Sequence, residues 1–230
     1  NPVADIVALA HDAGALALVD ATQSVPHMPV DAAAIDSDFL VFTGHKMCGP
    51  TGIGVLAADP ARLEAMEPFL GGGEMISDVT TEGSTWNDIP WKFEAGTPPI
   101  AEAVGLGEAV AFLEDVGPER IRAHEKVLAQ SMMDALDEVP GLTLYGPRDV
   151  ERRGASFSFS LEGVHPHDIG QFLDSKGVCV RAGHHCTKPL MRSMGVQSTA
   201  RASAYLYTTD DDVLALRDAL VECREWFGAA

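Results

Sequence analysis

The chain has 230 residues, 46% of them hydrophobic, so it can bury a core in one or two domains. Its net charge of −18 disfavours nucleic-acid binding, because phosphates would be repelled, and no apolar run is long enough to span a membrane. Four scattered cysteines without a Cys-x-x-Cys pair predict a cytoplasmic protein rather than a disulfide framework. The acidic surface fits a high-salt cytoplasm and an ordinary acidic bacterial protein about equally well.

The first elements predicted along the chain are a helix and a strand. Asn1 and Pro2 predict a helix start with Asn1 as N-cap. Residues 15–20 predict an apolar strand that ends in Asp20, with Gln23 just beyond. The chain begins with a helix that leads into a central strand, and no strand precedes this helix. We therefore expect the chain to be the C-terminal part of a larger protein whose N-terminal half is missing.

A second short strand, predicted at residues 38–43, leads into His45, Lys46 and a glycine-rich loop. Glycines let backbone approach a ligand, and a lysine at a strand end can reach a bound carbonyl group. Ligands of open α/β sheets collect at the carboxyl ends of strands, where Asp20 also lies. The alternative for Lys46 is a solvated side chain beside a hairpin.

The middle of the chain predicts a short helix after Asp59, a long irregular stretch at residues 71–99, and helices at 99–115 and 117–139. A loop as long as 71–99 is typically functional or part of an interface. Within it, Gly96-Thr97 offers a backbone amide and a hydroxyl to an anion.

The remainder predicts a smaller α/β unit. Its predicted strands are residues 142–145, 155–161, 178–181 and 199–207, and its predicted helices are 166–176 and 209–226. We therefore expect two domains, with residues 1–115 belonging to a large domain and residues 116–230 forming a small C-terminal domain.

Cys186 lies in the smaller unit, just after a predicted strand, in the sequence Arg181-Ala-Gly-His-His-Cys186. The nearby cations Arg181 and Lys188 would favour the thiolate, and an exposed thiolate is a competent nucleophile. Zinc binding by His184, His185 and Cys186 is the weaker alternative, because adjacent residues rarely converge on one ion.

Two other cysteines are predicted to pack rather than react. Cys223 falls on the apolar face of the last helix, and Cys48 lies beside the lysine loop.

Six motifs together resemble the SufS-type (group II) cysteine desulfurases and selenocysteine lyases, which have the class V aminotransferase fold. They are Val19-Asp-Ala-Thr-Gln23, Thr43-Gly-His-Lys46 with Gly49-Pro-Thr-Gly-Ile-Gly54, Gly71-Gly-Gly-Glu-Met-Ile76, Phe93-Glu-Ala-Gly-Thr97, Arg181-x-Gly-His-His-Cys186 and Arg201-Ala-Ser203. The motif that ends in Cys186 discriminates best. The resemblance implies an α/β, fold-type I pyridoxal 5′-phosphate (PLP)-dependent transferase, similar to aspartate aminotransferase.

The resemblance implies a cofactor site in the first part of the chain. Lys46 would hold PLP as a Schiff base and shuttle the substrate α-proton, with His45 beside it. Asp20 would pair with the pyridinium nitrogen and Gln23 with the ring hydroxyl. Thr43 and His45 would bind the phosphate.

It also implies the remaining contacts. Gly96 and Thr97 would reach the phosphate of the partner subunit in a homodimer. Arg201 would bind the substrate carboxylate, for which a bidentate guanidinium is suited. Cys186 would attack the sulfur of L-cysteine, and Arg181 would support the loop that carries it. The resemblance also implies L-selenocysteine as a possible second substrate.

The implied function is a PLP-dependent cysteine desulfurase that forms L-alanine and a persulfide on Cys186 and supplies iron–sulfur cluster assembly through a SufE-type or SufU-type sulfur acceptor. One alternative is another class V enzyme, an aminotransferase or kynureninase-like lyase, which would use Asp20 and Lys46 but not Cys186. The other is an inactive fragment of the desulfurase.

Overall fold

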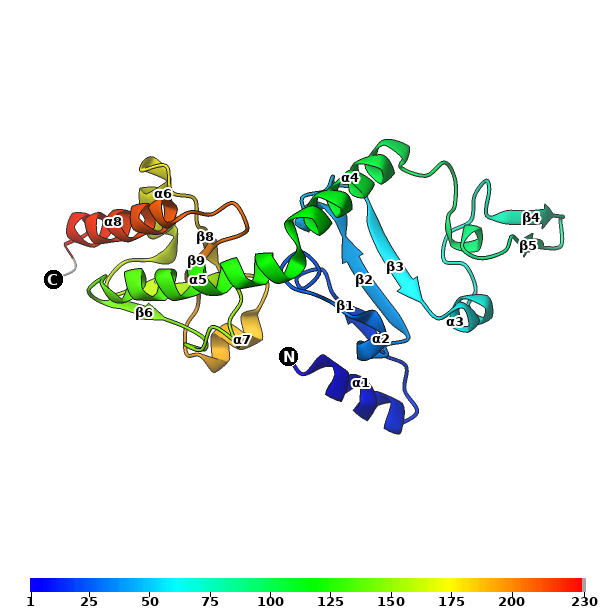
Figure 1. Cartoon of the computed structure of the whole chain (residues 1–230), viewed down its shortest axis with the longest axis horizontal. Coiled ribbons are helices and arrows are strands. Elements are labelled where there is room, and N and C mark those ends of the chain that lie inside the picture. Colours follow the sequence, from blue (N-terminus) through cyan, green and yellow to red (C-terminus); the bar gives the residue numbers. More distant parts are fainter. Residues whose placement is uncertain (229–230) are drawn as a thin grey trace. The chain divides into compact units, whose positions relative to one another are not determined.

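The computed structural model describes residues 1–228, which form two compact units. The first unit is Asn1–Glu119 and the second begins at Arg120, close to the start of helix α5 (Pro118–Asp137) (Figure 1). Within residues 1–228, every helix is too short or too polar to cross a lipid bilayer.

The first unit is built on a three-stranded sheet in the order β1 (Leu18–Asp20), β2 (Phe39–Thr43), β3 (Gly54–Ala58). β1 and β2 run parallel, so their carboxyl ends lie at the same edge, whereas β3 returns antiparallel to β2. The helices of this unit are α1 (Val3–Asp12), α2 (Ala32–Ile35), α3 (Pro60–Ala65) and α4 (Ile100–Val116). The sheet therefore presents two strand ends side by side.

Two expectations for the first unit are corrected. Helix α1 has Pro2, not Asn1, at its N-cap position, without a side-chain cap. The stretch 71–99 is not irregular throughout, because it contains the hairpin β4 (Ile76–Val79) and β5 (Ser84–Trp86) and the 3₁₀ turn η2 (Trp91–Phe93). Thr80 closes the hairpin turn, since its amide donates to the Gly83 carbonyl at 2.8 Å.

The second unit contains an antiparallel sheet in the order β6-β7-β9-β8. Its strands are β6 (Leu142–Leu144), β7 (Ser156–Leu161), β8 (Arg181–Gly183) and β9 (Thr199–Ser203), and its helices besides α5 are α6 (Pro166–Ser175), α7 (Lys188–Ser193) and α8 (Asp210–Trp226). The strand predicted at 178–181 instead begins at Arg181, and the sequence did not predict α7.

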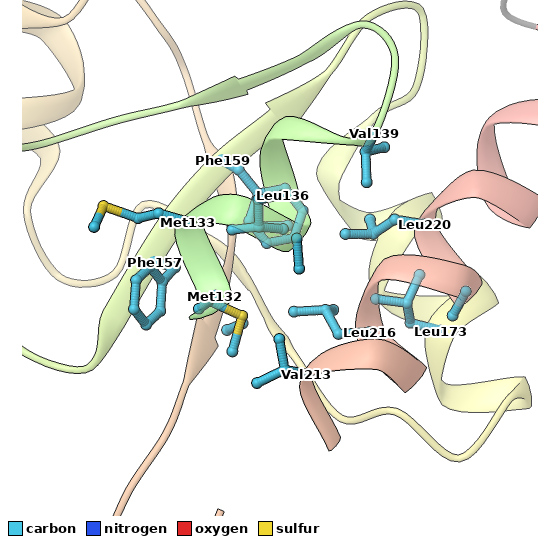
Figure 2. Packing of buried hydrophobic residues seen from close by; sticks show 14 of the residues in the cluster. Met132, Met133, Leu136, Val139, Phe157, Phe159, Leu173, Val213, Leu216 and Leu220 are labelled. Carbon is cyan, nitrogen blue, oxygen red and sulfur yellow. The ribbon is translucent and has the colours of Figure 1, made fainter. Parts of the chain in front are cut away.

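The core of the second unit lies between its sheet and helices (Figure 2). Phe157 and Phe159 alternate with polar residues along β7, and both are fully buried. Leu136 of α5, Leu173 of α6 and Leu220 of α8 belong to the same cluster. Each such side chain contributes roughly 1.5–3 kcal/mol by leaving water. This core supports β8 and β9, the strands from which Arg181 and Arg201 project.

Candidate active site

Asp20 and Lys46 leave the first unit's sheet at the same edge. Asp20 ends β1, and Lys46 ends the 3₁₀ turn η1 (Gly44–Lys46) that directly follows β2. Hydrogen bonds from Thr22 lower the pKa of Asp20, and the positive charge of Lys46 lowers it further. The carboxylate therefore stays ionised at neutral pH beside a lysine.

The loop around Lys46 is closed by backbone contacts. The Gly44 amide donates to the Ile53 carbonyl, and the Gly49 amide donates to the Gly44 carbonyl, both at 3.0 Å. A Cβ atom at Gly49 would lie 2.9 Å from that carbonyl oxygen, so a larger residue does not fit. These glycines thus allow the loop to close on itself, whereas the sequence suggested that they face a ligand.

Helix α4 packs behind this loop. A Cβ atom at Gly105 would lie 3.3 Å from the Pro50 ring, and one at Gly44 would lie 3.4 Å from Leu106. Leu106 is itself buried. The loop is therefore held from the side of α4, while the Lys46 side chain is exposed.

Polar side chains next to Lys46 complete this group. The Thr43 hydroxyl lies 3.0 Å from His45 Nδ1 and 3.3 Å from the Ile53 carbonyl oxygen, to which it donates. His45 and Gln23 are exposed, and Thr43 is partly exposed. An amine, an ionised carboxylate, a hydroxyl, an imidazole and an amide are the groups that a phosphorylated pyridine aldehyde requires, so this donor set fits PLP.

Two sequence-based expectations at this site are corrected. The amide of Gly96 donates to the Gly73 carbonyl at 2.9 Å, so it is not a free donor for an anion; Thr97 beside it is exposed. Cys48 was expected to pack, yet it is exposed and has a positive φ of 62°. Packing thus explains Cys223, which is buried and whose thiol pKa burial raises to about 11, but not Cys48.

The second unit presents Cys186 on an exposed loop after β8. Arg181 Nη2 donates to the Cys186 sulfur at 3.5 Å, and the Cys186 amide donates to His184 Nδ1 at 3.2 Å. His185 and Cys186 both adopt left-handed backbone conformations, with φ of 52° and 64°. Each costs about 1–3 kcal/mol in a non-glycine residue, so surrounding contacts must hold this turn.

His185 turns inward from the same loop. Its Nε2 lies 2.9 Å from Thr199 Oγ1 and 3.1 Å from the Thr199 carbonyl oxygen, and Thr199 is fully buried on β9. Burial, and then the positive charge of Arg201, lower the pKa of His185, which is therefore neutral at pH 7. Within residues 1–228, no cluster of three or more His, Cys, Asp or Glu side chains is arranged to hold a metal ion.

Arg201 lies opposite Arg181 in the pairing of β8 with β9. Its Nε atom is buried and has no hydrogen-bond partner among the described residues. Burial lowers the pKa of Arg201, as does the Arg181 charge, whereas the Cys186 thiolate raises it. A guanidinium remains charged at neutral pH, so two cations with an unused donor favour an anionic ligand here.

The sequence profile of the class-V aminotransferases matches residues 1–216, so the chain belongs to this family. A probable cysteine desulfurase of Streptomyces coelicolor is 52% identical over 228 residues, covering 99% of this chain and 54% of that protein. The cysteine desulfurase of Haloferax volcanii is 50% identical over 227 residues, and the match covers 99% of this chain and 53% of that protein. The chain thus spans about half the length of the curated relatives it matches.

A solved structure has the same fold. The cysteine desulfurase CsdA from Escherichia coli, in an S-sulfonic acid form, superposes with a TM-score of 0.90 at 39% identity. The match covers 97% of this chain and 55% of CsdA. The predicted PLP-dependent α/β transferase fold is thereby confirmed.

The structure groups the predicted residues within each unit. In the first unit, Asp20, Thr43, His45 and Lys46 share one sheet edge. In the second, two further features were not assigned from sequence, namely the inward contact of His185 and its acceptor Thr199. The paired histidines of the motif were visible in the sequence, but nothing in it distinguished the inward one from the outward one.

Proposed function

We propose that this chain provides the catalytic groups of a PLP-dependent cysteine desulfurase. The observation that carries the proposal is the exposed Cys186 thiol, held on a strained turn within 3.5 Å of Arg181 Nη2. A nearby cation favours the thiolate, which is the nucleophilic form of cysteine. The desulfurase names of relatives about 50% identical support the same activity.

In this proposal the first unit binds the cofactor. Lys46 would hold PLP, Asp20 would pair with the pyridinium nitrogen, Gln23 would contact the ring hydroxyl, and Thr43 and His45 would contact the phosphate. The ionised state of Asp20 supports its part, since a carboxylate keeps the ring nitrogen protonated. PLP, when bound, supplies an electron-withdrawing ring that eases bond cleavage at the substrate carbons.

The second unit then acts on the substrate. Arg201 binds the carboxylate of L-cysteine through its guanidinium. The Cys186 thiolate attacks the substrate sulfur, so that a sulfur–sulfur bond forms and the carbon–sulfur bond breaks. The electron pair of the broken bond stays with the substrate β-carbon, which takes up a proton to become the methyl group of L-alanine. Lys46 Nζ moves the proton of the substrate α-carbon. The products are L-alanine and a persulfide on Cys186, and no external oxidant is needed.

We further propose the SufS-type branch, a homodimer in which the Gly96–Thr97 segment reaches the partner's phosphate through Thr97, and a cytoplasmic location. Selenocysteine as a second substrate and a SufE-type or SufU-type acceptor for iron–sulfur cluster assembly belong to the same proposal. The motif that ends in Cys186 and the four unpaired cysteines support these assignments.

The test compares Cys186→Ser with Cys179→Ser in the full protein as expressed from its gene. Cys179 is an exposed cysteine of the same unit and serves as the matched control. We expect Cys186→Ser to lose alanine formation from L-cysteine by at least about 100-fold, because its nucleophile is gone, and Cys179→Ser to retain it. Borohydride reduction and intact mass should show PLP on Lys46 in both. Alanine and sulfide release at full rate by Cys186→Ser would overturn the persulfide role.

A further inference from the structure

The Cys186 turn is tied to the core at one residue. His185 reaches Thr199 with a single ring nitrogen, and Thr199 is fully buried on β9. Strand β9 pairs with both β7 and β8, which makes it an interior strand of its sheet. The anchor of the turn is therefore a rigid part of the second unit.

The tautomer of His185 follows from its partners. A carbonyl oxygen can only accept, so the contact to the Thr199 carbonyl is a hydrogen bond in the tautomer that carries the proton on Nε2, and the Thr199 hydroxyl can accept from the same N–H group. The other ring nitrogen, Nδ1, is buried without a partner among the described residues. In this tautomer the single N–H group of neutral His185 donates to Thr199, and Nδ1 carries no proton.

The next residue along the chain is the nucleophile. His185 and Cys186 form two successive left-handed residues, so the anchored side chain sets the direction in which the Cys186 side chain leaves the backbone. That direction brings the sulfur to Arg181 Nη2 at 3.5 Å. His184, by contrast, is exposed, and its side chain accepts a hydrogen bond from the Cys186 amide within the loop.

We propose that His185 is a positioning residue that, through its hydrogen bonds to Thr199, holds the Cys186 thiol against Arg181. The inference rests on the proposed role of Cys186 as the nucleophile. His185 itself touches neither substrate nor cofactor. It acts by preventing the turn from relaxing away from the arginine.

The test measures the pH dependence of Cys186 alkylation by iodoacetamide, with each site quantified by peptide mass spectrometry in the full protein. The charged and titratable groups around the thiol are Arg181 of β8, Arg201 of β9, His184 and His185 of the turn, and Lys188 at the start of α7. Cys179 in the same sample provides an internal reference for an ordinary exposed thiol.

The variants separate the effect of the hydrogen bonds to Thr199 from the effect of the left-handed backbone conformation at residue 185. His185→Asn keeps a residue that tolerates the left-handed conformation but is too short to reach Thr199. We expect its alkylation midpoint to rise by about one pH unit, because the thiolate loses the arginine. His185→Gln, whose amide nitrogen reaches farther, should recover at least half of that shift. His184→Asn is the matched control, because an Asn side-chain oxygen can still accept from the Cys186 amide, and it should keep the original midpoint.

A double variant tests whether His185 acts on the Cys186 thiol through Arg181. Arg181→Gln should raise the midpoint at least as much as His185→Asn, and combining them should add nothing further. A folded His185→Asn protein with an unchanged midpoint, or an added shift in the double variant, would overturn the inference. If His185→Asn does not fold, Thr199→Val supplies the test, with a smaller rise expected and an unchanged midpoint counting against the anchor.

The same experiment distinguishes a failure of the proposed function. Equal midpoints for Cys186 and Cys179 in the unmodified protein would show that Cys186 is not activated. That result would overturn its nucleophilic role and the inference with it, whereas an activated Cys186 insensitive to His185 would overturn the inference alone.

Discussion

The two units of this protein differ in how completely they bury apolar side chains. In the second unit one cluster joins three helices to the sheet, and its members Phe157 and Phe159 are fully buried (Figure 2). In the first unit many large apolar side chains on α1, β1, β3 and α4 are exposed. They include Ile6, Leu9, Leu18, Leu56, Ile100, Val104 and Phe112.

This difference shows that the two sets of proposed catalytic residues are supported differently. Arg181 and Arg201 project from strands backed by a closed core. Lys46 and Asp20 project from a three-stranded sheet that has few buried residues, although α4 braces the lysine loop. Extensive exposed apolar surface is typical of surfaces that contact other protein. We therefore expect the first unit to depend on further protein more than the second.

The largest expected effect comes from separating the units. A fragment that begins at Arg120 should unfold cooperatively in urea, because its core is complete, whereas residues 1–119 alone should show no cooperative transition. Circular dichroism during urea titration is the measurement. Equal cooperativity of the two fragments would break the comparison.

A matched pair of substitutions tests the difference in burial between the two units within the whole protein. Phe157→Ala should lower the free energy of unfolding of the second unit by about 3–5 kcal/mol, because it opens a cavity in a fully packed core. Leu56→Ala in the first unit should cost less than about 1 kcal/mol, because Leu56 is 47% exposed. Urea denaturation gives both values, and similar losses would show that Leu56 is covered in solution.

Helix caps give a smaller contrast. Thr209 and Asp212 form a capping box at the long helix α8, whereas Asp59 caps the short helix α3 through the Ala61 amide. Thr209→Ala should cost about 1 kcal/mol. Asp59→Ala should cost less, since α3 contributes no fully buried side chain. Thr209→Ser, which keeps the hydroxyl, is the control, and a loss equal to that of alanine would exclude the cap as the cause.

The pH dependence of stability should differ between the units. The pKa of Asp38 lies below its usual 3.8, first because of the Ala17 amide and then His11, so its stabilisation is lost as pH falls below about 3.8. The pKa of His185 lies below its usual 6.5, so the unfolded state takes up a proton first and stability declines as pH falls below 6.5. His185→Asn should flatten the slope below pH 6.5, and Asp38→Asn the slope below pH 3.8. Denaturation midpoints across pH 3–8 test both, and an unchanged slope in either variant would contradict the assignment.

Part of the site could be predicted because its signals are local. The apolar run before Asp20 and the one before Lys46 predicted two strands, and the structure contains both and pairs them in parallel. The acidic residue before Pro60 predicted a cap that the structure contains. Strand and helix ends could not be placed to the residue, as the shift of β8 to Arg181–Gly183 shows, because pairing with β9 selects them.

By itself, the sequence determined the family and the order of most elements, and it supplied the proposed catalytic residues, since these depend on motif chemistry and on periodicity along the chain. Tertiary structure alone decided that the Gly96 amide donates to the Gly73 carbonyl, that Cys48 is exposed, and that His185 rather than His184 turns inward to Thr199. Each of these depends on a partner distant in sequence or on the burial of the residue, and neither is encoded in the residue's immediate neighbours.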